Sequence, residues 1–176
     1  MYNEYLPIGE VLKPQGVRGQ VKIRPDTDDP ARFLALDHVY IKNGADYISC
    51  SLESPEARAD GFVYAILCGA DTRDAAEKQR GWTLYVDRTH AVDLQEGQYF
   101  ISDLLGCNVQ DQQGNILGIL EDVLQPGAND VYQIKTGDGR RMYLPVLPFV
   151  IKDVQVRENL IIVDENRLPE VAVFED

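Results

Sequence analysis

Short apolar segments with alternating polar residues recur along nearly the whole chain, and this repeat constrains the fold more than any other feature. In "QVKIR", Val21 and Ile23 alternate with Lys22 and Arg24, the period of two that is typical of a strand with one buried face. Similar segments are "HVYIKN", "DVYQIKT" and "RMYLPV". Turns such as "GAD" and "GDGR" separate the strands, and only "DTRDAAEKQRG" favours a short helix of any clarity. The chain is therefore predicted to be all-β, built as two small β-barrels or sandwiches.

The strand pattern is interrupted once, near the middle of the 176 residues. The segment "DRTHAVDLQEGQ", residues 87–98, is polar and has no clear periodicity, and a new series of strands follows it. A chain of this length is ample for two small domains. We predict a first domain over residues 1–90, a linker over 91–97 and a second domain over 98–176.

Charge separates the two halves and limits the partners. The chain has 17 Lys and Arg against 29 Asp and Glu, a formal net charge of −12; residues 1–93 contribute −4 and residues 94–176 contribute −8. Proteins that neutralise many phosphates are normally basic, so any RNA contact must be local. One stretch runs against the trend: "GEVLKPQGVRGQVKIRP" carries four bases and one acid.

The sequence contains no motif typical of a catalytic, metal-binding or cofactor-binding site. The two histidines, His38 and His90, lie far apart, and no metal-ligand spacing, P-loop or nucleophile motif occurs, so we predict no metal, no cofactor and no catalysis. Three widely spaced cysteines, Cys50, Cys68 and Cys107, are expected to be reduced and to serve as small core residues rather than to form a disulfide. No segment approaches the roughly 20 apolar residues of a membrane helix, and the N-terminus lacks signal-peptide features. We therefore expect a cytoplasmic protein.

A second unusual stretch, "GQYFISDLLG" (97–106), places aromatic and apolar residues among turn residues at the predicted domain junction. Tyr99 and Phe100 could cement the two domains together. Exposed aromatics beside a linker are also typical of a protein-binding hot spot. The sequence leaves both interpretations open.

Three long stretches together resemble the RimM family of bacterial ribosome maturation factors. These are "IGEVLKPQGVRGQVKIRPDTDDPARF", "YFISDLLGCNVQDQQGNILGILEDVLQPGANDVYQI" and "YLPVLPFVIKDVQVRENLIIVD". The resemblance implies a split-barrel-like N-terminal domain and a C-terminal PRC barrel. It also implies a non-catalytic factor that binds the immature small (30S) ribosomal subunit through the nineteenth small-subunit ribosomal protein and promotes assembly and processing of 16S rRNA.

The resemblance also suggests site residues. The family's paired aromatics correspond to Tyr99 and Phe100, although the family often has two tyrosines, and Asp103, Leu104 and Leu105 complete the expected partner-binding segment. Asp103 would either face a basic partner with its charge or cap the next turn. Ribosomal proteins are basic, so the acidic second half suits such a partner. The basic hairpin of the first half would then face RNA. Its candidates are Lys13, Gly16, Arg18, Gly19, Lys22 and Arg24.

Simpler or different interpretations remain for both regions. The hairpin bases could merely solubilise an edge strand around a tight glycine turn. A flavin-binding split-barrel reductase and a PRC-barrel adaptor, which could associate with a membrane, are the alternative functions. We expect a monomer, and the tail after Asp164 receives no predicted function.

Overall fold

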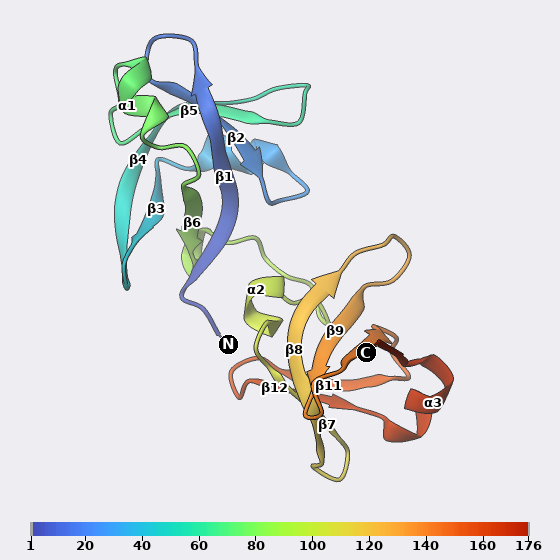
Figure 1. Cartoon of the computed structure of the whole chain (residues 1–176). Coiled ribbons are helices and arrows are strands. Elements are labelled where there is room, and N and C mark those ends of the chain that lie inside the picture. The colour runs from blue at the N-terminus through green and yellow to red at the C-terminus, as the bar shows by residue number, and fades with distance from the viewer. Residues whose placement is uncertain (1, 176) are drawn as a thin grey trace. The chain divides into compact units, whose positions relative to one another are not determined.

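The structure is a computed structural model that describes residues 2–175, and it divides the chain into two compact units (Figure 1). One unit comprises Glu4–Asp93. The other begins at Leu94 and also takes in Asn3, close to the N-terminus.

The first unit is a closed barrel of six antiparallel strands in the order β1-β2-β5-β4-β3-β6, with β6 pairing back onto β1. The strands are β1 (Tyr5–Gln15), β2 (Gln20–Pro25), β3 (His38–Asn43), β4 (Asp46–Ala57), β5 (Val63–Leu67) and β6 (Thr83–Asp87). The alternation predicted in β2 is present, because Val21 and Ile23 are fully buried while Arg24 is exposed. The inward-facing residues of all six strands make the barrel core.

Three short helical segments complete the first unit: η1 (Pro30–Ala35), α1 (Arg73–Glu77) and η2 (Arg88–His90). The predicted helix near residue 73 is confirmed, with the Thr72 hydroxyl accepting a hydrogen bond from the Ala75 amide as its N-cap. The turn with Pro30 at its start is a 3₁₀ helix that places Phe33 in the core.

The second unit holds one seven-stranded sheet in the order β11-β12-β7-β8-β9-β10-β13. The strands are β7 (Asn108–Asp111), β8 (Ile116–Leu124), β9 (Val131–Thr136), β10 (Arg141–Pro145), β11 (Ile151–Gln155), β12 (Leu160–Val163) and β13 (Val173–Glu175). Three short helical segments accompany it: α2 (Ile101–Leu104), η3 (Glu165–Arg167) and α3 (Leu168–Val171). The fully buried Ile134, Leu144 and Ile161 lie at the centre of its core. The predicted all-β class is confirmed.

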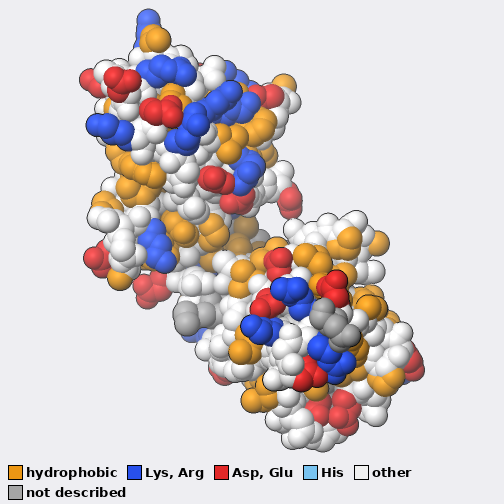
Figure 2. All heavy atoms as spheres, viewed as in Figure 1, with side chains coloured by type: hydrophobic (Ala, Val, Ile, Leu, Met, Phe, Trp, Pro, Cys, Tyr) orange, Lys and Arg blue, Asp and Glu red, His pale blue; other side chains and the backbone are white. Residues whose placement is uncertain are grey.

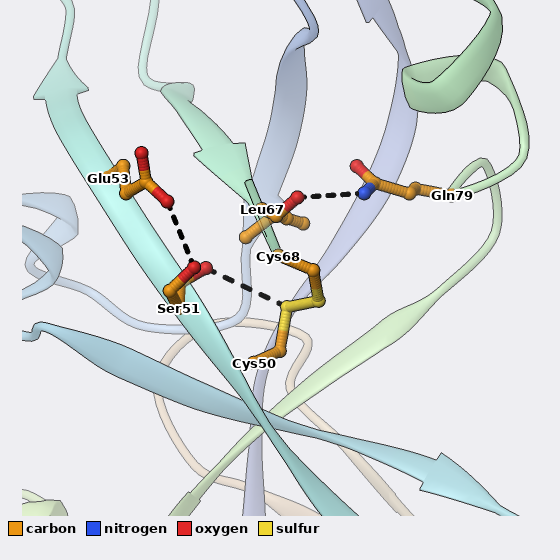
Figure 3. The surroundings of a disulfide bond; sticks show 6 residues. All are labelled: Cys50, Ser51, Glu53, Leu67, Cys68 and Gln79. Carbon is orange, nitrogen blue, oxygen red and sulfur yellow. Dashed lines mark hydrogen bonds between the residues drawn. A yellow bond between two sulfur atoms is a disulfide. The ribbon is translucent and has the colours of Figure 1, made fainter. Parts of the chain in front are cut away.

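The expectation of three reduced cysteines is wrong for two of them. Cys50 of β4 and Cys68, which directly follows β5, form a disulfide with their Cα atoms 4.9 Å apart (Figure 3). The neighbouring strands β4 and β5 pair antiparallel, with Leu52 opposite Leu67, and this register brings the two cysteines together. Sequence spacing alone does not reveal which strands are neighbours. Cys107 is a free, fully buried thiol, as predicted.

None of the helices within residues 2–175 is long and apolar enough to span a membrane.

Candidate functional site

The basic hairpin predicted from the sequence is formed by β1, β2 and the turn at residues 16–19. Gly16 and Gly19 both have positive φ, at +67° and +81°. Gly16 is open to solvent, whereas Gly19 is buried: a Cβ built on it would lie 2.1 Å from the carbonyl oxygen of Ala70. Gly19 is therefore required by the packing of the barrel itself, and a role of its backbone toward RNA stays a prediction.

The four hairpin bases differ in their freedom to bind a ligand. Lys13 and Arg18 are exposed, and within residues 2–175 neither of them forms an ion pair. Arg24, by contrast, forms an ion pair with Glu10. Lys22 is engaged as well, through the contacts described next. The hairpin therefore offers two bases that are available to a partner and two that already have partners within the unit.

Lys22 makes several contacts at the side of the barrel. Its Nζ lies 3.2 Å from Asp60 Oδ2 and 3.7 Å from the ring centroid of Phe62. Hydrogen bonds to Tyr64 and Asp60 raise the pKa of the Lys22 ammonium. Lys22 pairs directly opposite Lys13 across the strands. The Asp60 carboxylate offsets the repulsion that two like charges in this position produce.

Sequence reasoning missed one base at this place, Arg73. It is the first residue of α1, and its Nη1 donates a hydrogen bond of 2.9 Å to the carbonyl oxygen of Gly16. We call the exposed set Lys13, Arg18 and Arg73 the basic patch. Figure 2 shows Lys and Arg side chains gathered at the end of the first unit that carries the β1–β2 turn and α1. Only the fold brings Arg73 next to the turn.

The five predicted partner-binding residues fall into two groups. Tyr99 is 36% exposed, and Phe100 and Leu105 are half-buried. Asp103 and Leu104 are buried, in contrast to the expectation of a charge that faces a partner. We call Tyr99, Phe100 and Leu105 the aromatic surface; its binding role stays a prediction.

Asp103 has a structural task within the second unit. Its Oδ1 accepts a hydrogen bond of 2.9 Å from the Asn3 backbone amide, and the Asn3 side chain donates to the carbonyl oxygen of Ser102 at 2.7 Å. A segment close to the N-terminus is thereby attached to α2. No local sequence pattern around Asp103 indicates that Asn3 is its partner. For this reason the sequence suggested an exposed Asp103 carboxylate.

Ion pairs within the second unit engage most of its few bases. Its six Lys and Arg side chains stand against 14 Asp and Glu. Five of the six pair with carboxylates inside the unit, namely Lys135, Arg140, Arg141, Lys152 and Arg167. The acidic surplus therefore remains as the net field of this unit, and that field attracts basic partners.

Comparison with known proteins identifies the family to which the chain belongs. The family described as RimM N-terminal domain matches residues 6–91, and the RimM PRC barrel domain matches residues 101–167. A protein of Caldanaerobacter subterraneus named ribosome maturation factor RimM is 40% identical over 91% of this chain and 95% of its own length. A protein of the same name from Ruminiclostridium cellulolyticum is 39% identical over 90% and 93%.

Among solved structures, the N-terminal domain of RimM from Thermus thermophilus covers 53% of this chain and 100% of that one, with 20% identity and a TM-score of 0.42. The resemblance noted in the sequence is confirmed by the two family matches, which lie in order along the chain, and by relatives that align over nine-tenths of it. The chain therefore belongs to the RimM family.

Proposed function

We propose that the protein is a non-catalytic ribosome maturation factor that binds the immature small ribosomal subunit and promotes assembly and processing of 16S rRNA. The observation that carries the proposal is the match of both domains, in order, to relatives named ribosome maturation factor RimM. The second domain alone would leave the function open, because a fold does not determine a function. We expect the factor to act as a monomer in the cytoplasm.

Within this proposal the first unit contacts 16S rRNA through the basic patch. Lys13 and Arg18 are exposed and form no ion pair in residues 2–175, and Arg73 is exposed beside them. Three cations can neutralise only a few phosphates, so the contact is local and depends modestly on salt. The net charge of −12 of the whole chain opposes indiscriminate binding to RNA.

The second unit contacts a basic ribosomal protein of the small subunit, which we propose is the nineteenth. Its net charge of −8 complements a basic partner and would steer the encounter. The aromatic surface supplies the kind of side chains that dominate binding energy at protein interfaces. Tyr99, Phe100 and Leu105 expose apolar area in this acidic unit.

The experiment that tests the function is sedimentation of the full chain with purified immature small subunits. We expect the protein to travel with immature small subunits and to remain at the top of the gradient with large subunits. A protein that stays at the top in both cases would contradict the proposal. The absorption spectrum of the same sample tests the flavin alternative, because a bound flavin absorbs visible light.

The RNA contact is tested by Arg18→Ala, with Lys42→Ala as the control. Lys42 is an exposed base of the same unit, on β3, outside the basic patch. The slope of log affinity against log salt concentration is negative, and loss of one phosphate contact reduces its magnitude by about 0.7–0.9. We expect this change for Arg18→Ala and none for Lys42→Ala. Equal slopes in both variants and the wild type would refute the RNA-facing role.

The protein contact is tested with the double variant Tyr99→Ala, Phe100→Ala and with Phe149→Ala as the control. Phe149 is an aromatic of the same unit that is 47% exposed, somewhat more than Tyr99 at 36%. We expect the double variant to keep its melting temperature and to lose about thirtyfold in affinity for the isolated ribosomal protein. Unchanged affinity together with a lowered melting temperature would assign the pair to cementing the fold.

A further inference from the structure

The only two histidines of the chain, His38 and His90, lie side by side in the first unit although they are far apart in sequence. Their ring centroids are 5.3 Å apart. Asp87 joins them, and one ligand-type atom from each of the three residues lies within 4.8 Å of the other two. The sequence predicted no metal site because no local spacing links these residues. The fold creates the cluster.

The backbone fixes all three positions. Strands β3 and β6 pair antiparallel, with Tyr40 opposite Tyr85, and two residues further along the two strands are His38 and Asp87. The side chain of Asp87 also caps η2, since its Oδ1 accepts a hydrogen bond of 3.1 Å from the His90 amide. The barrel seam and a capped turn therefore hold the cluster.

Neighbouring groups orient the possible ligands. The Asp37 carboxylate contacts Nδ1 of His38, which favours the tautomer with a proton on Nδ1 and a free lone pair on Nε2. Thr89 Oγ1 donates to Asp87 Oδ1 at 2.6 Å, and the Tyr40 hydroxyl lies 3.3 Å from Asp87 Oδ2. A carboxylate that contacts the second ring nitrogen of a histidine, as Asp37 does, typically supports histidine ligands in metal sites.

The cluster contains negative charge of its own, and basic side chains lie near it. Asp37 and Asp87 are two carboxylates, and hydrogen bonds from Thr89 and His90 hold the pKa of Asp87 well below its ordinary value. Arg32 is a nearby cation, since its guanidinium donates to the carbonyl oxygen of His90 at 2.8 Å, and Arg88 belongs to η2 itself. The side chains of His38, Asp87 and His90 are 29%, 27% and 42% exposed, so an ion can enter from solvent.

We propose that His38, Asp87 and His90 form a binding site for a divalent transition metal of the zinc type. Two imidazoles and one carboxylate suit Zn²⁺, whereas Ca²⁺ and Mg²⁺ prefer oxygen ligands alone. Bond lengths of about 2.0–2.2 Å in tetrahedral geometry place ligand atoms about 3.3 Å apart, so the cluster contracts on binding. Asp87 Oδ1 and His90 Nδ1 are the exception, because they already lie 2.7 Å apart in a hydrogen bond, which is lost if both atoms bind the ion.

Three protein ligands leave a fourth position for water or for a group on a partner. Since a metal that binds only the folded state stabilises it, the ion would pin η2 to the barrel seam. This inference is independent of the proposed ribosomal function, because the cluster lies outside the basic patch and the aromatic surface. Failure of either proposal leaves the other standing.

The test uses the full chain, freed of metal with a chelator and kept oxidised so that Cys50 and Cys68 stay in their disulfide. Titration with Zn²⁺ is followed by calorimetry, and Co²⁺ serves as the spectroscopic probe. We expect one saturable site and an increase in melting temperature with Zn²⁺. His38→Ala or His90→Ala should weaken binding at least a hundredfold, and Asp37→Asn should weaken it about tenfold. The matched control Asp46→Asn removes an exposed acid of the same unit and should change nothing.

A second measurement does not depend on whether the variants fold. The wild-type chain has two imidazole rings in total, so its ring NMR spectrum contains two sets of histidine signals. Both sets should shift or broaden together on addition of one equivalent of Zn²⁺. Absence of a saturable site, or unchanged ring signals of either histidine at saturation, would overturn the proposal.

Discussion

Gly19→Ala is the substitution whose effect follows most directly from the structure, and Gly16→Ala is its matched control. Both glycines belong to the β1–β2 turn and both have positive φ, where an L-residue costs about 1–2 kcal/mol. They differ only in their surroundings. Nothing lies within 4 Å of a Cβ built on Gly16, but a Cβ on Gly19 would meet the Ala70 carbonyl oxygen at 2.1 Å and the Asp71 amide nitrogen at 2.9 Å.

Because the atoms in contact with residue 19 belong to the backbone, the clash cannot be relieved by rotating a side chain. Overpacking of this kind costs about 1–3 kcal/mol in addition to the conformational term. We therefore expect a loss of about 1–2 kcal/mol in the free energy of unfolding for Gly16→Ala and about 2–5 kcal/mol for Gly19→Ala. At about 4–8 °C per kcal/mol for a domain of this size, the two melting temperatures should be clearly separated.

Tryptophan fluorescence is the suitable assay, since the single tryptophan of the chain, Trp82, lies in the first unit and reports on that unit alone. Equal melting temperatures for Gly16→Ala and Gly19→Ala would refute the reasoning, because the close approach to Ala70 would then carry no energetic weight. Any loss of ribosome binding by Gly19→Ala has to be judged against this destabilisation.

Three further predictions concern stability. Reduction of the Cys50–Cys68 disulfide, which closes a loop with a sequence separation of 18, should lower the free energy of unfolding by about 3 kcal/mol in urea titrations followed through tryptophan fluorescence; an unchanged midpoint would contradict this. Burial raises the pKa of Tyr132 to about 12, so the folded state keeps a proton that the unfolded state releases from about pH 10 upward. The free energy of unfolding should therefore fall between pH 10 and 12. In Tyr132→Phe this fall should be smaller by up to roughly 3 kcal/mol, which is measured by unfolding both proteins as a function of pH. Asp103→Ala removes the acceptor for the Asn3 amide and should cost about 1–3 kcal/mol by circular dichroism, whereas Asp103→Asn keeps an acceptor oxygen and should cost less; equal losses would argue against the hydrogen bond.

The strands and hairpins could be predicted because their causes are local. The alternation of Val21 and Ile23 with charged neighbours follows from one buried face, and the Thr72 cap fixes the start of α1. The parallel pairing of β12 with β7 has no such local signal, since it joins strands with several others between them in sequence. The short β13 and α2 were missed for a related reason: α2 lacks a side-chain cap, and β13 pairs with β10 only through the fold.

In the candidate site, too, features with local causes could be predicted and features that depend on the fold could not. Which bases lie on the hairpin was evident from the sequence, but the engagement of Lys22 by Asp60 and the approach of Arg73 depend on tertiary contacts. Asp103 is buried, and it accepts a hydrogen bond from a residue 100 positions away in sequence. Pairs that lie distant in sequence therefore account for the differences, and the Cys50–Cys68 disulfide is the clearest example.

The most direct test of the account is the maturation of 16S rRNA in cells of the native host depleted of this protein. We expect precursor 16S rRNA to accumulate in free small subunits and a wild-type copy of the gene to reverse the accumulation. A normal ratio of precursor to mature 16S rRNA after verified depletion would contradict it.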